Sequence, residues 1–598
     1  MRTGTFSIAP LAYLERLRKN FSPLERVCFW VFALLLAGTS LLALARLNTV
    51  LLEEIPARGG TLKEGLIGTP RFINPLFALS EPERDLTALL YAGLLKPLPD
   101  GSLAPELAES YEISNDNLSY TVTIRENARF HDGSSVRAED VVFTVAAAQD
   151  SRLKSPKRGS WEGVTAEALD ERHVRFTLAR AYAPFPETLT LGIMPARLWR
   201  EFDPDTFLFS TLMSEPIGAG PFRLRRIDRD RNGVPKSYTL EGFQNYVLGA
   251  PYIETIRFLF YPNEAALLDA YTAGDIDSLT SVPPLYAERL ALSGVRLELA
   301  TLPRLFAVFL NQNRASVFSD EAIRRALAAA IDKDALIERV LRGYGSPAEG
   351  PIPPGLVEGL QGEGASRERS IASPREAAED ENLLPETPGQ HLVRAREILA
   401  HSGWAQDAKT NALEKRVGKE TKTIRFTLAT ADSSELKAAA MYVKEVWERL
   451  GISVTLAVFD MSALQHDVIR PREYDALLFG EIIGRDLDLY PFWHSSQRAD
   501  PGLNVALYTN LTADKLLEEA RTVSESTERI ERYRAFEREV EEDLPAIFLY
   551  APEFIYVVPE RLGGLDLGVM TTASERFLNV RDWYVERERV WPFFNSEQ

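Results

Sequence analysis

The sequence has very little cysteine and no surplus of basic residues. Cys28 is the one cysteine among 598 residues, so the chain can form neither an internal disulfide framework nor a cysteine-based zinc site. Lys and Arg together number 68 against 86 Asp and Glu, which gives a formal net charge of −18. Because nucleic-acid binding requires basic side chains that neutralise phosphates, this balance argues against nucleic acid as a partner.

Catalytic motifs are also lacking. The sequence contains no H-E-x-x-H, no phosphate-binding G-x-x-x-x-G-K-[ST], no dinucleotide-binding G-x-G-x-x-G and no G-x-S-x-G nucleophile elbow. The six histidines are scattered without metal-ligand spacing. We therefore expect a protein that is not an enzyme and holds neither a cofactor nor a metal.

One short stretch imitates a calcium site. Residues 228–233 match the first half of an EF-hand loop, D-x-D-x-N-G. The acidic ligand at the last loop position falls on Thr239, so the loop lacks a key ligand. Strand-like sequence lies on both sides, and the tip of a β-hairpin is the simpler prediction.

A long apolar run lies near the N-terminus. Residues 27–45 are 19 consecutive residues without a charge, close to the ~20 that cross a bilayer as a helix. Basic residues precede the run, and Glu53 and Glu54 follow it. The positive-inside rule then predicts a cytoplasmic tail at 1–26, a single-pass anchor at 27–45 and an exported remainder. Ala43-Leu44-Ala45 resembles a signal-peptidase site, so removal of the segment is the alternative.

Beyond a short tether at 46–58, strands alternate with helices, as in an α/β protein. Residue types and spacing predict strands at 61–69, 120–127, 423–430 and 452–460, and helices at 138–149, 320–341 and 433–451. The later strand–helix–strand order predicts a βαβ unit. Residues 355–390 are rich in Gly, Ser, Pro and Glu, which is typical of a solvated, mobile insertion.

His131, Asp132 and Gly133 form a conspicuous polar cluster between a strand and a helix. Asp-Gly is turn chemistry, because glycine tolerates a positive φ and aspartate bonds its neighbouring backbone. No nucleophile or third catalytic group is visible nearby. We therefore interpret the cluster as scaffold.

The same region carries an ordered series of motifs. Between residues 91 and 144 the series is Gly93-Leu94, Asp100-Gly101, Pro105, Leu107-Ala108, Tyr120-Thr121, Phe130-His131-Asp132-Gly133 and Ala138-Glu139-Asp140-Val141. It resembles the signature region of the family 5 extracellular solute-binding proteins, which are oligopeptide and dipeptide receptors of ABC importers. Arg137 departs from the family's usual capping residue. Weaker similarity extends over most of residues 59–550.

The resemblance implies a fold and its boundaries. It implies a two-lobed α/β fold of the type II periplasmic-binding-protein class, with an extra subdomain in lobe one. Lobe one is expected at 59–310, with the subdomain at about 95–217. Lobe two is expected at 311–534, and residues 535–598 are expected to return to lobe one.

The resemblance also implies a ligand site at residues 474–497. In related peptide receptors an aspartate here pairs with the peptide's α-ammonium, which a buried carboxylate binds well. Alignment on Phe492-Trp493 matches Asp488 and Arg485 to the family's two aspartate positions. The candidate ligand-binding residues are Asp486, Asp488, Arg485, Glu481, Tyr490, Trp493 and Asn311. Arg485 as a carboxylate clamp or a plain salt bridge, and the aromatic residues as pocket walls or core, remain open alternatives.

The function that the resemblance implies is solute capture for import. We expect a monomeric, membrane-anchored, extracellular or periplasmic receptor that binds peptides between its lobes and delivers them to ABC permease subunits. One alternative is the same fold binding another solute, such as an oligosaccharide or a metal chelate. Another is a surface sensor or interaction protein without transport.

Overall fold

The computed structural model describes residues 22–354 except 281, residue 356, and residues 389–591 except 408–409, 411, 418–419, 486 and 524. Most of the predicted tail at 1–26 and of the predicted insertion at 355–390 lies outside the described residues, as does Asp486. The chain divides into two compact units, one of residues 1–57 with 586–598 and the other of residues 58–585.

The smaller unit combines a long helix with a strand pair. Helix α2 (Pro23–Leu51) contains the predicted span, and its segment Pro23–Ala43 is long and apolar enough to cross a membrane. The helix runs past residue 45, and β1 (Glu53–Ala57) pairs antiparallel with β23 (Glu586–Val590). The predicted tether at 46–58 is therefore mostly helix and strand.

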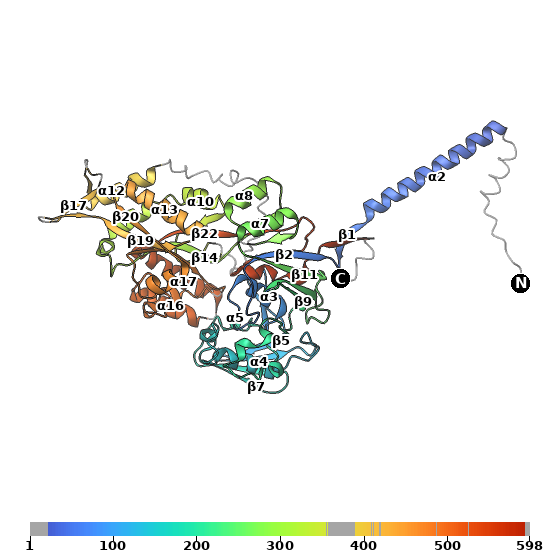
Figure 1. Ribbon diagram of the computed structural model, residues 1–598, viewed down its shortest axis with the longest axis horizontal. Coiled ribbons are helices and arrows are strands. Elements are labelled where there is room, and N and C mark those ends of the chain that lie inside the picture. The colour runs from blue at the N-terminus through green and yellow to red at the C-terminus, as the bar shows by residue number, and fades with distance from the viewer. Residues whose placement is uncertain are drawn as a thin grey trace. The chain divides into compact units, whose positions relative to one another are not determined.

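The larger unit is built on one 12-stranded sheet (Figure 1). Its strand order is β20-β19-β21-β14-β22-β12-β2-β11-β10-β9, and β13 and β15 also pair with β22. The strands of this sheet are β2 (Thr61–Ile67), β9 (Phe222–Arg229), β10 (Pro235–Gly242), β11 (Thr255–Tyr261), β12 (Ser278–Leu279), β13 (Leu297–Thr301), β14 (Arg304–Leu310), β15 (Gly345–Pro347), β19 (Arg425–Ala431), β20 (Ser453–Phe459), β21 (Ala476–Ile482) and β22 (Ala546–Val557). β9 and β10 form the predicted hairpin around residues 230–233.

Helices cover the sheet. They are α3 (Glu81–Leu90), α7 (Glu264–Ala273), α8 (Pro284–Leu292), α9 (Glu321–Ala329), α10 (Lys333–Leu341), α12 (Gln390–His401), α13 (Ser434–Arg449), α16 (Leu511–Thr522) and α17 (Ser526–Asp543). Helix α4 (Ala138–Gln149) lies in the subdomain, and the shortest helices are α5 (Phe185–Thr188), α6 (Ala196–Trp199), α14 (Met461–Ala463) and α15 (Tyr490–Trp493).

Two large hydrophobic cores flank the middle of the sheet, and we name the lobes by them. The core of lobe one contains buried residues from Leu62 to Leu302 and again from Phe554 to Val585. The core of lobe two runs from Leu305 to Tyr550. The cores therefore part near residues 303 and 552 rather than at the expected boundaries 311 and 535, because β14 and α17 both pack within lobe two.

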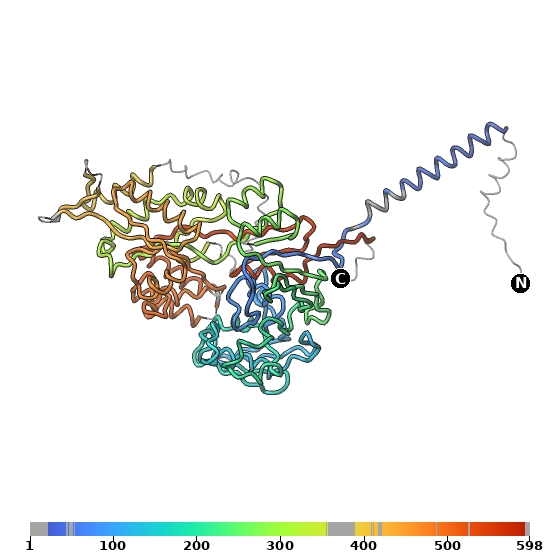
Figure 2. The backbone as a smooth tube through the Cα atoms, in the orientation of Figure 1, coloured from blue at the N-terminus to red at the C-terminus, as the bar shows by residue number. Residues whose placement is uncertain are grey.

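Strand β22 belongs to both lobes. Its first half pairs with β14 and β15, and its second half pairs with β13 and β12 (Figure 2). The chain passes from β13 to β14 through Leu302 and Pro303 alongside it. Two antiparallel connections, one through residues 301–304 and one through residues 550–553, thus join the lobes and form the hinge.

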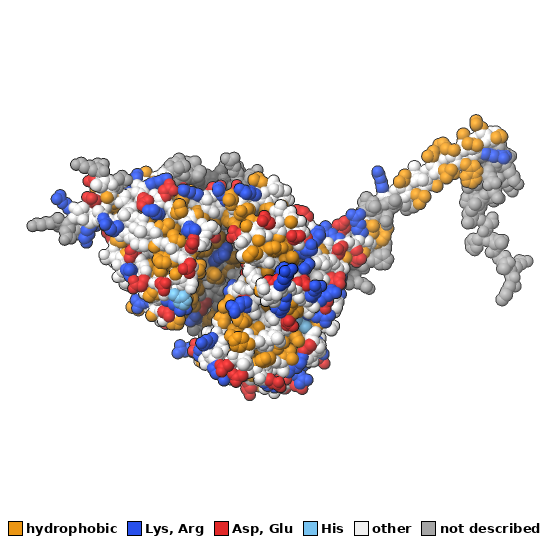
Figure 3. Space-filling model, viewed as in Figure 1, with side chains coloured by type: hydrophobic (Ala, Val, Ile, Leu, Met, Phe, Trp, Pro, Cys, Tyr) orange, Lys and Arg blue, Asp and Glu red, His pale blue; other side chains and the backbone are white. Residues whose placement is uncertain are grey.

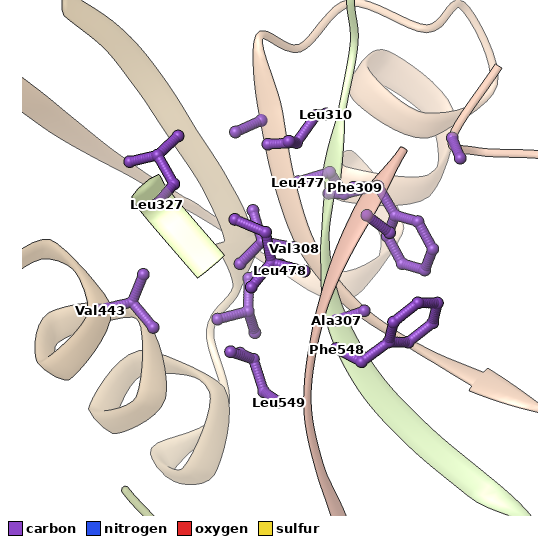
Figure 4. Packing of buried hydrophobic residues seen from close by; sticks show 14 of the residues in the cluster. Ala307, Val308, Phe309, Leu310, Leu327, Val443, Leu477, Leu478, Phe548 and Leu549 are labelled. Carbon is purple, nitrogen blue, oxygen red and sulfur yellow. The ribbon is translucent and has the colours of Figure 1, made fainter. Parts of the chain in front are cut away.

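Lobe two contains the predicted βαβ unit. β19 and β20 are parallel neighbours, and α13 connects them. In Figure 4, Val443 and Leu327 approach the face of the sheet that carries Val308 and Leu478, and the rings of Phe309 and Phe548 lie on the other face. The single helix predicted at 320–341 is instead two, α9 and α10, because Asp332 accepts the backbone N–H of Ala335 and begins a new helix.

Lobe one carries a subdomain around a second sheet. Its four strands are β5 (Ala108–Ile113), β6 (Ser119–Ile124), β8 (His173–Leu178) and β7 (Val164–Ala168), in that spatial order. Helix α4 has the predicted bounds, and Asp140 caps it by accepting the backbone N–H of Arg137 at 2.8 Å. The carboxylate of Asp140 thus supplies the cap that the Arg137 side chain does not.

The His131 cluster is structural, as predicted. Nε2 of His131 donates to the Gly220 carbonyl at 3.1 Å, and Nδ1 accepts the Gly218 N–H at 3.3 Å. These contacts hold two glycines so close to α3 that a Cβ on Gly218 would lie 1.9 Å from the Leu90 carbonyl oxygen. The motif therefore joins the subdomain to the large sheet.

A buried arginine lies at the centre of lobe one. Arg576 is fully buried and pairs with two buried carboxylates, Glu64 of β2 at 3.0 Å and Asp85 of α3. Its guanidinium lies over the rings of Phe577 and Tyr556. Tyr556 donates to Glu64 at 2.8 Å, which adds β22 to the network.

Replacement of Arg576 by methionine is expected to destabilise the protein by about 3–5 kcal/mol, because it leaves two carboxylates buried without their cation. Equilibrium urea unfolding of the full chain, followed by tryptophan fluorescence, measures this. Arg325→Met, which removes an exposed pair with Glu321, is the control and is expected to change stability by about 0.3–0.5 kcal/mol. Equal effects of the two substitutions would contradict the assigned role.

His131 is expected to make the protein acid-sensitive. Burial lowers the pKa of His131 to about 4, against the opposing effect of the Gly220 carbonyl. In the unfolded chain His131 takes up a proton below about pH 6.5, whereas in the folded protein it does so only near pH 4. The free energy of unfolding therefore falls by roughly 2–3 kcal/mol as the pH drops from about 6.5 to about 4. His131→Gln is expected to flatten this part of the stability–pH curve, and an unchanged slope would contradict the assignment.

Candidate functional site

The segment after β21 lies where the two lobes meet. Figure 3 shows the surface hollowed between the lobes. Arg485, in the loop after β21, donates from Nη2 to Oε2 of Glu575 in lobe one at 2.6 Å. Arg485 is only 4% exposed, and its Nη1 finds no hydrogen-bond partner among the described residues. Arg485 therefore links the two lobes, and its Nη1 can still donate a hydrogen bond to a ligand.

A second contact between the lobes involves Asp488. Its carboxylate accepts from Nε and Nη2 of Arg521, the latter at 2.6 Å, and lies 3.5 Å from the Tyr182 hydroxyl of lobe one. The backbone N–H of Ala183 also donates to the Arg521 carbonyl at 3.0 Å. Asp488 is thus already engaged by an arginine in this conformation.

Tyr490 belongs to the same cluster. The Arg521 guanidinium lies 3.9 Å from the centre of the Tyr490 ring, and His494 stacks on the ring at 4.1 Å. Burial alone would lower the pKa of Arg521, but the hydrogen bond to Asp488 and the charge of that carboxylate raise it overall. The loop therefore presents an aromatic ring and a bound cation together.

Glu481 is the unusual residue of the segment. It lies near the end of β21, opposite Leu305 of β14, and is 4% exposed. Neither carboxylate oxygen has a hydrogen-bond partner among the described residues. Burial raises the pKa of Glu481 to about 8, and the neighbouring Trp493 offsets part of this effect. An unpartnered buried carboxyl is costly, which makes Glu481 a candidate partner for a ligand cation.

Of the remaining candidate residues, one lies beside Glu481 and one lies far from it. Trp493, the neighbour of Glu481, is fully buried and packs on Phe309 and Phe548 in the core of lobe two. Asn311 follows the far end of β14, roughly 20 Å along the strand from the position opposite Glu481. Its side chain donates to the Arg472 carbonyl and accepts two backbone N–H groups of the following turn. The structure therefore groups Arg485, Asp488 and Tyr490 but not Asn311.

Three residues at the contact between the lobes were not predicted from the sequence. Tyr182, Arg521 and Glu575 come from the subdomain, from α16 and from the C-terminal part of lobe one. No local pattern marks them, because each reaches the loop after β21 through folding alone. Among the described residues, no three His, Cys, Asp or Glu side chains gather to hold a metal ion.

The chain is similar to known proteins over most of its length. The chain is 27% identical over 518 residues to the oligopeptide-binding protein AppA of Bacillus subtilis, which covers 85% of this chain and 89% of AppA. It is 28% identical over 512 residues to protein XP55 of Streptomyces lividans, covering 84% and 85% of the two chains.

Solved structures show the same fold. The structure of Bacillus subtilis AppA in complex with a nonapeptide has a TM-score of 0.66 and 26% identity, covering 89% of this chain and all of that one. The substrate-binding protein CtaP of Listeria monocytogenes has a TM-score of 0.71 at 23% identity, covering 88% of this chain and 100% of that one. The predicted two-lobed, type II α/β fold is confirmed.

The family model described as bacterial extracellular solute-binding proteins, family 5 middle, matches residues 102–500. This match covers more than half of the chain, and it includes most of the motif series and most of the segment at the contact between the lobes. The chain belongs to the family 5 bacterial extracellular solute-binding proteins.

Proposed function

We propose that this protein captures peptides between its two lobes and hands them to the permease of an ABC importer, with no catalysis of its own. The observation that carries the proposal is the contact between the lobes at the loop after β21. There, buried charged groups of lobe two meet lobe one, and one of them, Arg485, has an Nη1 without a hydrogen-bond partner among the described residues. A relative named for oligopeptide binding, solved with a nonapeptide, supports peptides as the ligand class.

Closure around the ligand follows from the two-strand hinge. A ligand selects the closed form only through contacts that exist when both lobes touch it. Arg485 and Asp488 already reach Glu575 and Tyr182 across the lobes, so they stand where such contacts form. An extended peptide offers backbone groups to both lobes and tolerates varied side chains in wet pockets, which favours broad specificity.

Glu481 and Arg485 are the residues we assign to charged ends of the ligand. The carboxyl of Glu481, which has no hydrogen-bond partner among the described residues, suits an ammonium that would supply a charge-assisted hydrogen bond. Nη1 of Arg485, unpartnered within the same described part of the chain, suits a carboxylate or a backbone carbonyl. Asp488 acts instead by holding Arg521 against Tyr490.

Helix α2 is proposed as the membrane anchor. Its apolar segment is long enough to span a membrane, and basic residues precede it in the sequence, so the positive-inside rule predicts a cytoplasmic N-terminus. An anchor raises the receptor's concentration near a permease in the same membrane.

Gently purified full-length protein in detergent is expected to carry short peptides. Native mass spectrometry should reveal a series of bound masses, and a tryptic peptide mixture should raise the Tm of the emptied protein. A single bound mass that matches no peptide would show that the ligand is another kind of solute, with the assignment of the fold unaffected. An empty protein that no peptide stabilises would favour an interaction protein without transport.

Glu481→Gln is expected to stabilise the ligand-free protein and weaken peptide binding. The folded state keeps the Glu481 proton up to about pH 8, whereas the unfolded chain loses it near pH 4.5, so wild-type stability falls as pH rises between these values. Glutamine removes that loss and also removes the anion that would bind an ammonium. We expect a higher Tm at pH 8 and a peptide Kd raised at least about tenfold.

Glu537→Gln is the matched control. Burial, with the nearby Glu541, raises the pKa of Glu537 to about 7, and this residue of α17 is outside the segment at the contact between the lobes. The control should also stabilise the protein at pH 8 but leave the peptide Kd unchanged. Peptide affinity lost equally in both variants, or in neither, would remove Glu481 from the proposed site.

A further inference from the structure

Lobe one contains a partly open cavity that is separate from the loop after β21. Its volume is about 210 Å³, and it lies between α3, strand β3 (Leu95–Pro97) and residues 574–581. The exposed residue Ala88 lines it, so the cavity reaches the surface beside α3. Pockets for drug-sized ligands measure roughly 300–1,000 Å³, so this one admits only a small molecule.

Two hydroxyl groups in the cavity wall lack partners. Tyr91 is 4% exposed and lines the cavity, and its hydroxyl makes no hydrogen bond to any described residue. The hydroxyl of Thr87, one turn earlier in α3, is also buried and also makes no hydrogen bond to any described residue. Buried polar groups normally have partners, so these two indicate a polar occupant.

The cavity also holds one cation and one anion that do not pair with each other. Lys96 donates from Nζ to the Leu578 carbonyl at 3.0 Å, and no ion pair to a described carboxylate accompanies this bond. Glu106 is 7% exposed and accepts from the Tyr246 hydroxyl at 2.5 Å and the Gly93 N–H at 3.0 Å. Burial raises the pKa of Glu106, and the charge of Lys96 opposes this effect.

The other charges of the cavity wall are already neutralised. Glu575 pairs with Arg485, and Arg581 pairs with Asp582 at 2.8 Å. What remains is an ammonium and a carboxylate in one small cavity, with two hydroxyls that can donate or accept. This pattern complements a molecule that carries both an anionic and a cationic group.

We propose that this cavity is a second ligand site, which binds a small free amino acid in its zwitterionic form. Lys96 and the hydroxyls of Tyr91 and Thr87 bind the carboxylate, and Glu106 binds the ammonium. The inference does not depend on peptides being the ligand between the lobes. Because Glu575 lines the cavity and also pairs with Arg485, an occupant lies beside the contact between the lobes.

Calorimetric titration of the full-length protein in detergent tests the proposal. The probes are glycine, L-alanine and L-serine, with acetate and methylammonium as half-ligands that carry one charge each. We expect at least one amino acid to bind, and each half-ligand to bind at least about tenfold more weakly, since each lacks one charge-assisted contact. Absence of heat for all three amino acids would mean that the cavity holds water only and would overturn the proposal.

Variants then locate the binding. Lys96→Met is expected to weaken amino-acid binding at least about tenfold. Tyr91→Phe should weaken it several-fold while leaving the Tm of the ligand-free protein unchanged or higher, because the hydroxyl it removes has no partner. A structural role for the hydroxyl would instead lower the Tm.

Two controls complete the test. Lys236→Met replaces an exposed lysine of β10 that is outside the cavity wall, and it should not change the affinity. Asp488→Asn alters the contact between the lobes and should also leave amino-acid binding intact. Binding lost in Asp488→Asn but kept in Lys96→Met would assign the amino acid to the cleft between the lobes and overturn the proposal.

Discussion

The pairing of Arg576 with Glu64 and Asp85 is the constraint on which lobe one depends. The three side chains are fully buried, and they come from β2, from α3 and from a segment nearly 500 residues later in the chain. A guanidinium in an apolar core is tolerated only when its charge is matched, so these elements must assemble together. Its position over Tyr556 also brings in β22, the strand that both lobes share.

Glu575, the residue before Arg576, contacts lobe two. Glu575 pairs with Arg485, so a rigid attachment in lobe one holds one wall of the contact between the lobes. Among the described residues, buried polar atoms of Glu481, Arg485 and Tyr91 have no hydrogen-bond partner. A ligand that supplies the missing partner to such a buried group gains most from binding.

Local sequence predicted much of the fold and little of the site. Helix α4, the βαβ unit and the hairpin after β9 follow from short patterns, and the motif series around His131 identified the subdomain region. Asp332 could have been recognised as a helix start, but the alanine-rich run before it favoured one continuous helix. Contacts such as Arg521 with Asp488 and Tyr182 with Asp488 join residues 33 and 306 positions apart, and no single-sequence pattern encodes them.

The late position of β22 affects how the chain matures. This strand lies between β14 and β12 in the sheet, yet it is made only after residue 545. At a synthesis rate of about 5–20 residues per second, the earlier strands of both lobes therefore wait tens of seconds for their shared neighbour. The nascent chain therefore cannot complete either lobe before residues 546–557 have been made.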